Sequence, residues 1–407
     1  MIYSVLNAAQ SALLLAIVNR VSGEDASGVF GFAFSVALLF MFVGNYGIRN
    51  FQVSDVKEKY TPGQYYAART VSIFLMGIGS VVYLAVCGYD AGKSGVIAAL
   101  LLWRAGECAE DVFHGRYQQE GKLYIAGIQG SVRLLLADAV FLGMLLAGSG
   151  LSTAAFGMAA VSALAVIGFA VITLPKFGGF SIDLKGQMWG KLLIETFPLF
   201  LNYFLITYLA NVSKYAMEHF SSDAEQGYFN MLFTPVLVVN LLSTMVFRPL
   251  ITEMAGRLEK GKVADYRTLV RRQEGVILLI GAAVLLAVYF IGLPVLSLFY
   301  GSNLSAYRLP LLLMMAGGIF SAFSSFYNVC IVTLRGQKQV LILTAVAAAA
   351  AYGFHYKLMN VLIAVTDTSY ILPVSIAFLL SMILQAGLYA VLHARLVAGE
   401  EKADGKG

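Results

Sequence analysis

The stretch VFGFAFSVALLFMFVGNYGIRNFQVSD, residues 29–55, decides the fold of this chain. Its first part is almost entirely apolar and is as long as a helix that crosses a bilayer, about 20 residues. The apolar run closes on Gly47 and Arg49, and a polar segment follows. We therefore predict a transmembrane helix over 29–48, with Arg49 at its end.

The composition of the whole chain is typical of a membrane protein. Hydrophobic residues make up 59% of the 407 residues and charged residues only 13%, whereas soluble domains carry about 25% charged residues. The apolar segments are far too long for the strands of a membrane barrel, so we expect helices that satisfy their own backbone groups. This indicates an all-α, polytopic membrane protein with twelve transmembrane helices. The predicted spans are 2–18, 29–48, 71–88, 94–113, 124–147, 151–174, 192–212, 228–247, 275–299, 309–333, 339–363 and 373–395.

The basic residues predict the orientation of these spans. Most of the 28 Lys and Arg residues fall in the even-numbered loops and the tail, which the positive-inside rule places in the cytoplasm. Both termini are then cytoplasmic, and we expect a multi-pass protein of the cell membrane. The first residues lack a basic leader and a cleavage pattern, so we interpret them as the first span and not as a removed signal peptide.

An internal repeat indicates two halves of six helices each. A single shift of the sequence on itself aligns similar residues in the second span of each half, and in both cases an acid-containing loop precedes the span. The aligned pairs include Gly28 with Gly227, Phe30 with Phe229, Phe34 with Phe233 and Arg49 with Arg248. Transporters often place the substrate path between such repeats. The predicted parts are an N-terminal lobe (1–174), a cytoplasmic linker with a candidate interfacial helix (175–191), a C-terminal lobe (192–397) and a cytoplasmic tail (398–407).

Three segments resemble the polysaccharide (O-antigen type) flippases of the multidrug/oligosaccharidyl-lipid/polysaccharide exporter superfamily. They are NRVSGEDASGVFGFAF (19–34), GIRNFQVSDVKEKY (47–60) and GYFNMLFTPVLVVNLLSTMVFRPLITEMAG (227–256). The resemblance implies two six-helix lobes around a central cavity. It also implies that undecaprenyl-pyrophosphate-linked oligosaccharide moves from the cytoplasmic to the outer leaflet by alternating access. The partners would be this lipid-linked oligosaccharide and membrane lipids, with glycan assembly enzymes as further candidates. We expect a monomer that is not an enzyme and binds neither a cofactor nor nucleic acid.

Charged residues within the predicted spans are the candidate site. Moving a hydrated pyrophosphate through hydrocarbon is very costly, and arginine suits phosphate because its planar fork donates two bonds. Arg104, Glu107, Asp111 and His114 share one helix face by their spacing. On the functional interpretation this face lines a cavity, where Arg104 meets pyrophosphate and Glu107 restrains it. On the structural interpretation it forms an ion pair that joins two helices.

Further charged residues carry the same two interpretations. Arg133, also near mid-bilayer, either faces the cavity or pairs with Glu107 or Asp111. Cations at helix ends either bind phosphate or only set the orientation. Lys357 should face the interior if its helix continues to Ile363. The substrate-binding candidates are Arg104, Arg49, Arg248, Arg133, Arg20, Lys214 and Lys357. The candidates for ion coupling or restraint are Glu107, Asp111, His114, Asp138 and Glu195.

Two other functions remain open on the sequence. A cation-coupled multidrug exporter of the same superfamily should place an acid in its first span, but the polar residues there are Asn7, Gln10 and Ser11. A membrane enzyme of glycan assembly normally needs a sizeable outer loop with convergent catalytic groups, and the longest outer loop here is short. The chain also has no nucleotide-binding motif, so ATP is not expected to drive it directly.

Overall fold

The first helix shows how a glycine divides one long helical segment into two spans. In the computed structural model, which describes residues 2–55, 57–185, 187–247, 250–366 and 369–404, α1 covers Ile2–Asn45. It is interrupted at Gly23, whose φ of 87° lies in the left-handed region that side chains disfavour. α1 therefore contains both of the first two predicted spans, and they meet at this glycine without a separate loop.

By its internal contacts the chain divides into two compact units, Met1–Thr207 (unit 1) and Tyr208–Gly407 (unit 2). The division lies within α7 (Met188–Phe220), later than the predicted linker at 175–191. The first turns of α7 belong to unit 1 because Leu192 is buried in one of its apolar clusters. In addition, Glu195 accepts a 2.7 Å hydrogen bond from the Lys59 ammonium.

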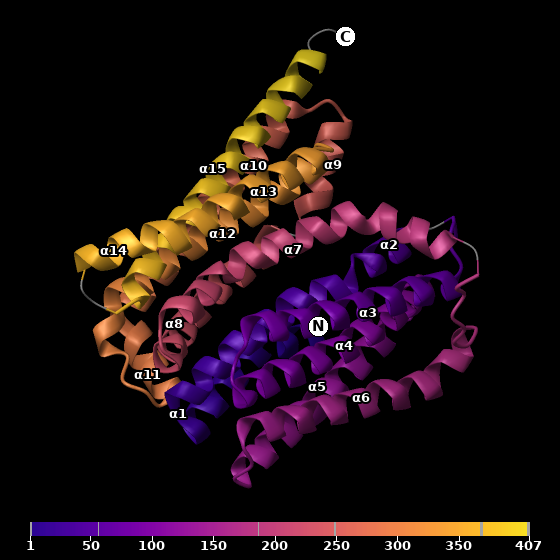
Figure 1. Cartoon of the computed structure of the whole chain (residues 1–407). Helices are drawn as coiled ribbons and strands as arrows, with labels where there is room; N and C mark the ends of the chain where they lie inside the picture. Colours follow the sequence, from indigo (N-terminus) through magenta and orange to yellow (C-terminus); the bar gives the residue numbers. More distant parts are fainter. Residues whose placement is uncertain (1, 56, 186, 248–249, 367–368, 405–407) are drawn as a thin grey trace. The chain divides into compact units, whose positions relative to one another are not determined.

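Unit 1 is built around α4, which packs against α1, α2, α3, α5 and α6 (Figure 1). Its elements are α1, α2 (Ile48–Ser54), α3 (Pro62–Cys87), α4 (Ala91–Gln119), α5 (Leu123–Leu146), α6 (Leu151–Thr173), the short 3-10 helix η1 (Leu174–Phe177) and the start of α7. The start of α3 illustrates how the sequence sets these bounds. Thr61 caps the helix by accepting a hydrogen bond from the backbone N–H of Gln64, and Pro62 fits the first helical position because it needs no partner there.

Unit 2 has α12 and α15 at its centre, with α8 and α10 packed on α12 and α13 on α15. Two of its spans contain π-helical turns, η3 and η5. Besides the end of α7, its elements are α8 (Asp223–Phe247), α9 (Ile251–Glu259), α10 (Val263–Ala287), η3 (Val288–Gly292), α11 (Leu293–Tyr300), η4 (Ser305–Tyr307), α12 (Arg308–Thr333), α13 (Gln337–Gly353), η5 (Phe354–Leu358), α14 (Met359–Thr366) and α15 (Ile371–Asp404).

The prediction of an all-α membrane protein is confirmed. Every regular element in the described ranges is helical, and nine of the described helices are long and apolar enough to cross a membrane. α1 provides two of the predicted spans, and the 29-residue α4 and 25-residue α8 are also long enough. Together these helices account for the twelve predicted spans.

The predicted interfacial helix between the lobes is not formed. After η1 the described residues up to Met188 are not helical. Gly178 and Gly179 have φ values of 93° and 78°, which end the helical turn. Beyond them, the backbone N–H of Asp183 donates to the carbonyl of Gly63, and this bond ties the segment to the first turn of α3.

Candidate functional site

The end of α1 turns Arg49 toward a pocket in unit 1. We predicted that the second span would continue to residue 48, but α1 ends at Asn45. Tyr46 and Gly47 both have positive φ, 49° and 70°, so the chain turns sharply and restarts as α2. Arg49 therefore lies on a separate short helix and not on the last turn of the span. The absence of a side chain at Gly115 lets α2 approach α4, since a Cβ there would lie 2.2 Å from the Gln52 amide oxygen.

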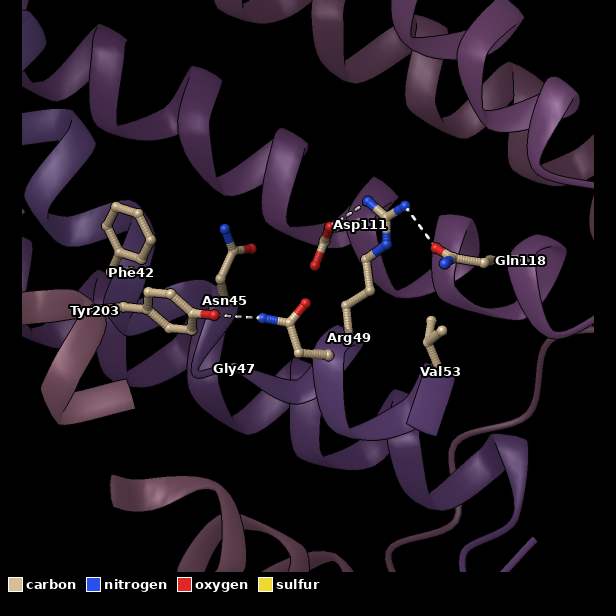
Figure 2. A pocket seen from close by; sticks show the side chains of 9 residues that line it. Phe42, Asn45, Gly47, Arg49, Val53, Asp111, Gln118 and Tyr203 are labelled. Carbon is tan, nitrogen blue, oxygen red and sulfur yellow. Dashed lines mark hydrogen bonds and ion pairs between the residues drawn. The ribbon is translucent and has the colours of Figure 1, made fainter. Parts of the chain in front are cut away.

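The pocket beside α2 has a volume of about 410 Å³ and is lined by both polar and apolar side chains (Figure 2). This size falls within the range of small-ligand sites. The side chains come from the end of α1, from α2, from α4 and from the first half of α7, all within unit 1. The lining residues are Phe42, Asn45, Gly47, Arg49, Asn50, Val53, Asp111, Gln118 and Tyr203.

Two arginines share one carboxylate at this pocket. The Arg49 guanidinium donates to Asp111 Oδ1 at 3.1 Å and to Gln118 Oε1 at 3.2 Å, as Figure 2 shows. Arg69 donates to the other oxygen, Asp111 Oδ2, at 2.7 Å. It also donates to the carbonyl of Gly44 and to the side-chain oxygen of Asn45. The three charged groups together carry one net positive charge.

The two arginines differ in how accessible they are. The Arg69 side chain is 3% exposed, whereas that of Arg49 is 29% exposed and lines the pocket. Arg69 is thus fixed behind Asp111, and Arg49 can exchange partners. In the sequence, Arg69 precedes the predicted span 71–88 among the basic residues of a loop, and nothing in its spacing showed that it would meet Asp111 from another helix.

An aromatic wall completes the pocket. The rings of Phe42 and Tyr203 stack with centroids 6.0 Å apart, and the Asn50 amide donates to the Tyr203 hydroxyl at 3.0 Å. Next to them, Tyr46 and Phe200 stack at 4.5 Å. These contacts fix the start of α7 beside α2 and leave polar groups and ring faces along one side of the cavity.

The arginines predicted at mid-bilayer are buried inside unit 1. Arg104 is 4% exposed and Arg133 is 1% exposed. Arg104 forms an ion pair with Glu107, and its guanidinium lies 4.1 Å from the centre of the Trp103 ring. Arg133 Nε donates to Glu110 Oε2 at 2.6 Å, and its Nη2 lies 3.9 Å from Glu107. Both arginines are therefore buried with carboxylate partners inside unit 1.

Glu110 on α4 was not among the candidates that the helical spacing singled out, and its side chain is 3% exposed. It is bonded to Arg133 and lies 3.4 Å from His114. Of the predicted stripe, only Asp111 reaches the described pocket. The stripe divides because Glu107 and Glu110 turn toward α5, whereas Asp111 turns toward α2 and α3.

The other predicted cations are dispersed. Arg20 is exposed near the break in α1, and Lys214 on α7 is half-buried, with its ammonium 5.4 Å from the centroid of the Phe233 ring. Lys357 is exposed on the π-helical turn η5. The π-helical turn instead buries His355, which bonds to Ser213 at 2.8 Å. Arg248 lies outside the described residues.

Two predicted acids have specific partners. Asp138 on α5 accepts a 2.7 Å hydrogen bond from Gln10 on α1, and Glu195 pairs with Lys59. No group of three or more possible metal ligands occurs among the described residues.

Comparisons with known proteins support the fold. No protein-family model matches the chain. The chain is 20% identical over 368 residues to the capsular polysaccharide biosynthesis protein CapF of Staphylococcus aureus, covering 88% of this chain and 87% of that protein. It also superposes on an inward-facing multidrug resistance MATE family transporter of the MOP superfamily, with a TM-score of 0.67 and 14% identity. The match covers 97% of this chain and 96% of that transporter. The outward-facing form of such a transporter gives a TM-score of 0.59 with 16% identity, and the match covers 97% of this chain and 93% of that transporter. The chain therefore has the same fold as these MATE family transporters.

Proposed function

We propose that this protein is a flippase that moves undecaprenyl-pyrophosphate-linked oligosaccharide from the cytoplasmic to the outer leaflet by alternating access. The pocket beside α2 receives the pyrophosphate. The fold is that of transporters, and the similarity to CapF, a capsular polysaccharide biosynthesis protein, favours a polysaccharide cargo.

The single observation that carries this proposal is the excess of cation over anion at the pocket. Asp111 already has a close partner in the buried Arg69, so the more exposed Arg49 can leave it and bind a phosphate. A guanidinium can donate two parallel bonds to phosphate oxygens, which makes arginine well suited to this exchange. Asp111 would then keep its charge neutralised through Arg69.

The rest of the pocket suits the sugar that follows the pyrophosphate. The side chains of Asn45, Asn50 and Gln118 provide amide donors and acceptors, and Phe42 and Tyr203 provide ring faces. A volume of about 410 Å³ holds only a small head group, so the lipid tail and the distal glycan must extend outside it. The pocket would therefore recognise the common pyrophosphate end of the cargo.

The competing function is cation-coupled multidrug export. It is favoured by the superposition on multidrug resistance transporters and by the half-buried Asp138, which is bonded to Gln10 in unit 1. At this level of identity, however, the superposition establishes only the fold. An excess positive charge at the pocket also suits an anionic cargo better than the cationic compounds that an acidic site would bind.

Transport in proteoliposomes tests the proposal. Full-length protein is reconstituted, and labelled lipid-pyrophosphoryl oligosaccharide is followed between leaflets. In parallel, dye efflux is measured under an imposed Na⁺ or H⁺ gradient. We expect leaflet transfer of the lipid without gradient-driven dye efflux. Dye efflux without lipid transfer would refute the proposal and favour the exporter.

A further inference from the structure

The hairpin of α7 and α8 in unit 2 brings a lysine and a carboxamide to the same depth. α7 ends at Phe220 and α8 begins at Asp223. Lys214 and Asn230 are each roughly 10 Å from these ends, at a rise of about 1.5 Å per residue. The Lys214 ammonium lies 5.4 Å from the centroid of the Phe233 ring, so the two helices meet at this level.

Two buried carboxamides on the same face of α8 have no partner. Gln226, Asn230 and Phe233 follow i, i+4, i+7 spacing and therefore share one face. Gln226 is 1% exposed and Asn230 is 3% exposed. Among the described residues, no hydrogen bond is made by the amide nitrogen or oxygen of either side chain. Buried polar groups are nearly always bonded, so the amide donors and acceptors of these two side chains are available to a ligand.

Lys214 is also without a counter-charge. In the part of the chain that the structure describes, no carboxylate lies within ion-pair distance of its ammonium, and its contact is with the ring of Phe233. A lysine that is partly buried and unpaired has a strong tendency to attract an anion, because its charge is only partly solvated.

Unit 1 has a similar contact between a cation and a ring, but there the cation has a counter-charge. Phe34, the repeat equivalent of Phe233, has the guanidinium of Arg104 4.8 Å from its ring centroid, but Glu107 neutralises that cation. Ser27 occupies the position equivalent to Gln226, and its hydroxyl donates to a backbone carbonyl at 2.8 Å. Gly31 replaces Asn230 and has no polar side chain. The two orphaned carboxamides therefore have no counterpart at the equivalent positions of unit 1.

We propose that Lys214, Asn230 and Gln226 form a second anion site, which binds a phosphate of the lipid-linked pyrophosphate. The ammonium supplies the charge, and the two carboxamides supply directional N–H donors. This inference rests on the proposed flippase function. The positive-inside pattern puts the α7–α8 turn on the outer side, so the site accepts the pyrophosphate after the switch and releases it there.

The binding test uses full-length protein in phosphatidylcholine nanodiscs, with undecaprenyl pyrophosphate as the probe. It is made in an Arg49→Gln background, which removes the first phosphate site. We expect Lys214→Gln to weaken binding at least about tenfold and Lys214→Arg to retain most of it. Inorganic pyrophosphate should compete, and undecaprenol should not bind in its place. The matched control is Arg308→Gln, which removes another cation that lies over a ring in unit 2, 5.5 Å from the Tyr289 centroid. Arg308→Gln in the Arg49→Gln background should bind undecaprenyl pyrophosphate as tightly as Arg49→Gln alone.

A stability measurement separates binding from folding. Replacing Gln226 and Asn230 together by leucine removes the orphaned amides, so the thermal midpoint should be unchanged or higher while binding is lost. Unchanged binding by Lys214→Gln, or a lower midpoint with unchanged binding in the leucine variant, would overturn the site.

If wild type binds through Lys214 but transfers no lipid-linked oligosaccharide, the flippase proposal fails and the anion site stands. If wild type transfers the lipid and Lys214→Gln does so equally well with normal binding, the site fails and the flippase stands.

Discussion

Replacing Arg49 by glutamine should separate transport from stability. The Arg49 side chain is 29% exposed, so its ion pair with Asp111 contributes about 0–1 kcal/mol to folding. A phosphate bound to the same guanidinium accepts charge-assisted hydrogen bonds worth about 1.5–3 kcal/mol. Since about 1.4 kcal/mol is a factor of ten, we expect the rate of lipid transfer at low cargo to fall by about 10- to 100-fold. The free energy of unfolding should fall by less than about 1 kcal/mol.

The assay compares transfer of labelled lipid-pyrophosphoryl oligosaccharide in proteoliposomes with thermal unfolding of the same preparation. Arg116→Gln is the matched control. Arg116 lies near the end of α4, pairs with Glu120 at 2.8 Å and does not line the pocket. It removes the same charge and should keep most of the rate. Normal transfer by Arg49→Gln would refute phosphate binding at the pocket. An equal loss in Arg116→Gln would show that general charge, and not the pocket, sets the rate.

Three further predictions concern stability. Asp111→Asn should lower the free energy of unfolding by about 3 kcal/mol, because Arg69, whose side chain is only 3% exposed, loses its carboxylate partner. A loss below about 1 kcal/mol in thermal unfolding would contradict the description of one carboxylate shared by two arginines. Glu110→Gln and Arg133→Gln should each lower the free energy of unfolding by about 3 kcal/mol, because each single change leaves the other charge buried and unpaired. The double variant should lose less than the sum of the two. Additive losses would show that the two residues do not act as a pair. Burial opposes ionisation of Asp55, but hydrogen bonds from the backbone N–H groups of Lys59 and Tyr60 and from the Tyr65 hydroxyl hold its pKa below the usual 3.8. The folded pKa lies below the unfolded one, so the stability advantage of wild type over Asp55→Asn should be complete above about pH 5 and be lost as the pH falls below about 4; an advantage that grows on acidification would contradict this.

The span pattern could be predicted from the sequence because it depends on the length of apolar runs alone. The sequence also singled out Arg49, which lines a pocket in the structure, since a cation at the end of such a run is conspicuous. The turn that aims it into the pocket was not predictable. It depends on Tyr46 and Gly47 both adopting positive φ, and for Tyr46 this conformation is uncommon.

Ion-pair partners on different helices could not be predicted from the sequence. Spacing along α4 shows which acids share a face, but not which neighbouring helix each face meets. Arg69 on α3 and Glu110 on α4 were therefore missed, although both contribute to the charge balance of unit 1. The π-helical turn η5 was also not predictable. Such a turn adds a residue to the local turn and rotates the faces that follow, and here His355 is buried and Lys357 is exposed.

An experimental structure of the protein with undecaprenyl pyrophosphate tests the central claim most directly. We predict that a phosphate oxygen lies within hydrogen-bond distance of the Arg49 guanidinium, that the contact between Arg49 and Asp111 is lost, and that Arg69 stays bound to Asp111. A structure in which Arg49 remains on Asp111 while the pyrophosphate binds elsewhere in unit 1 would contradict it.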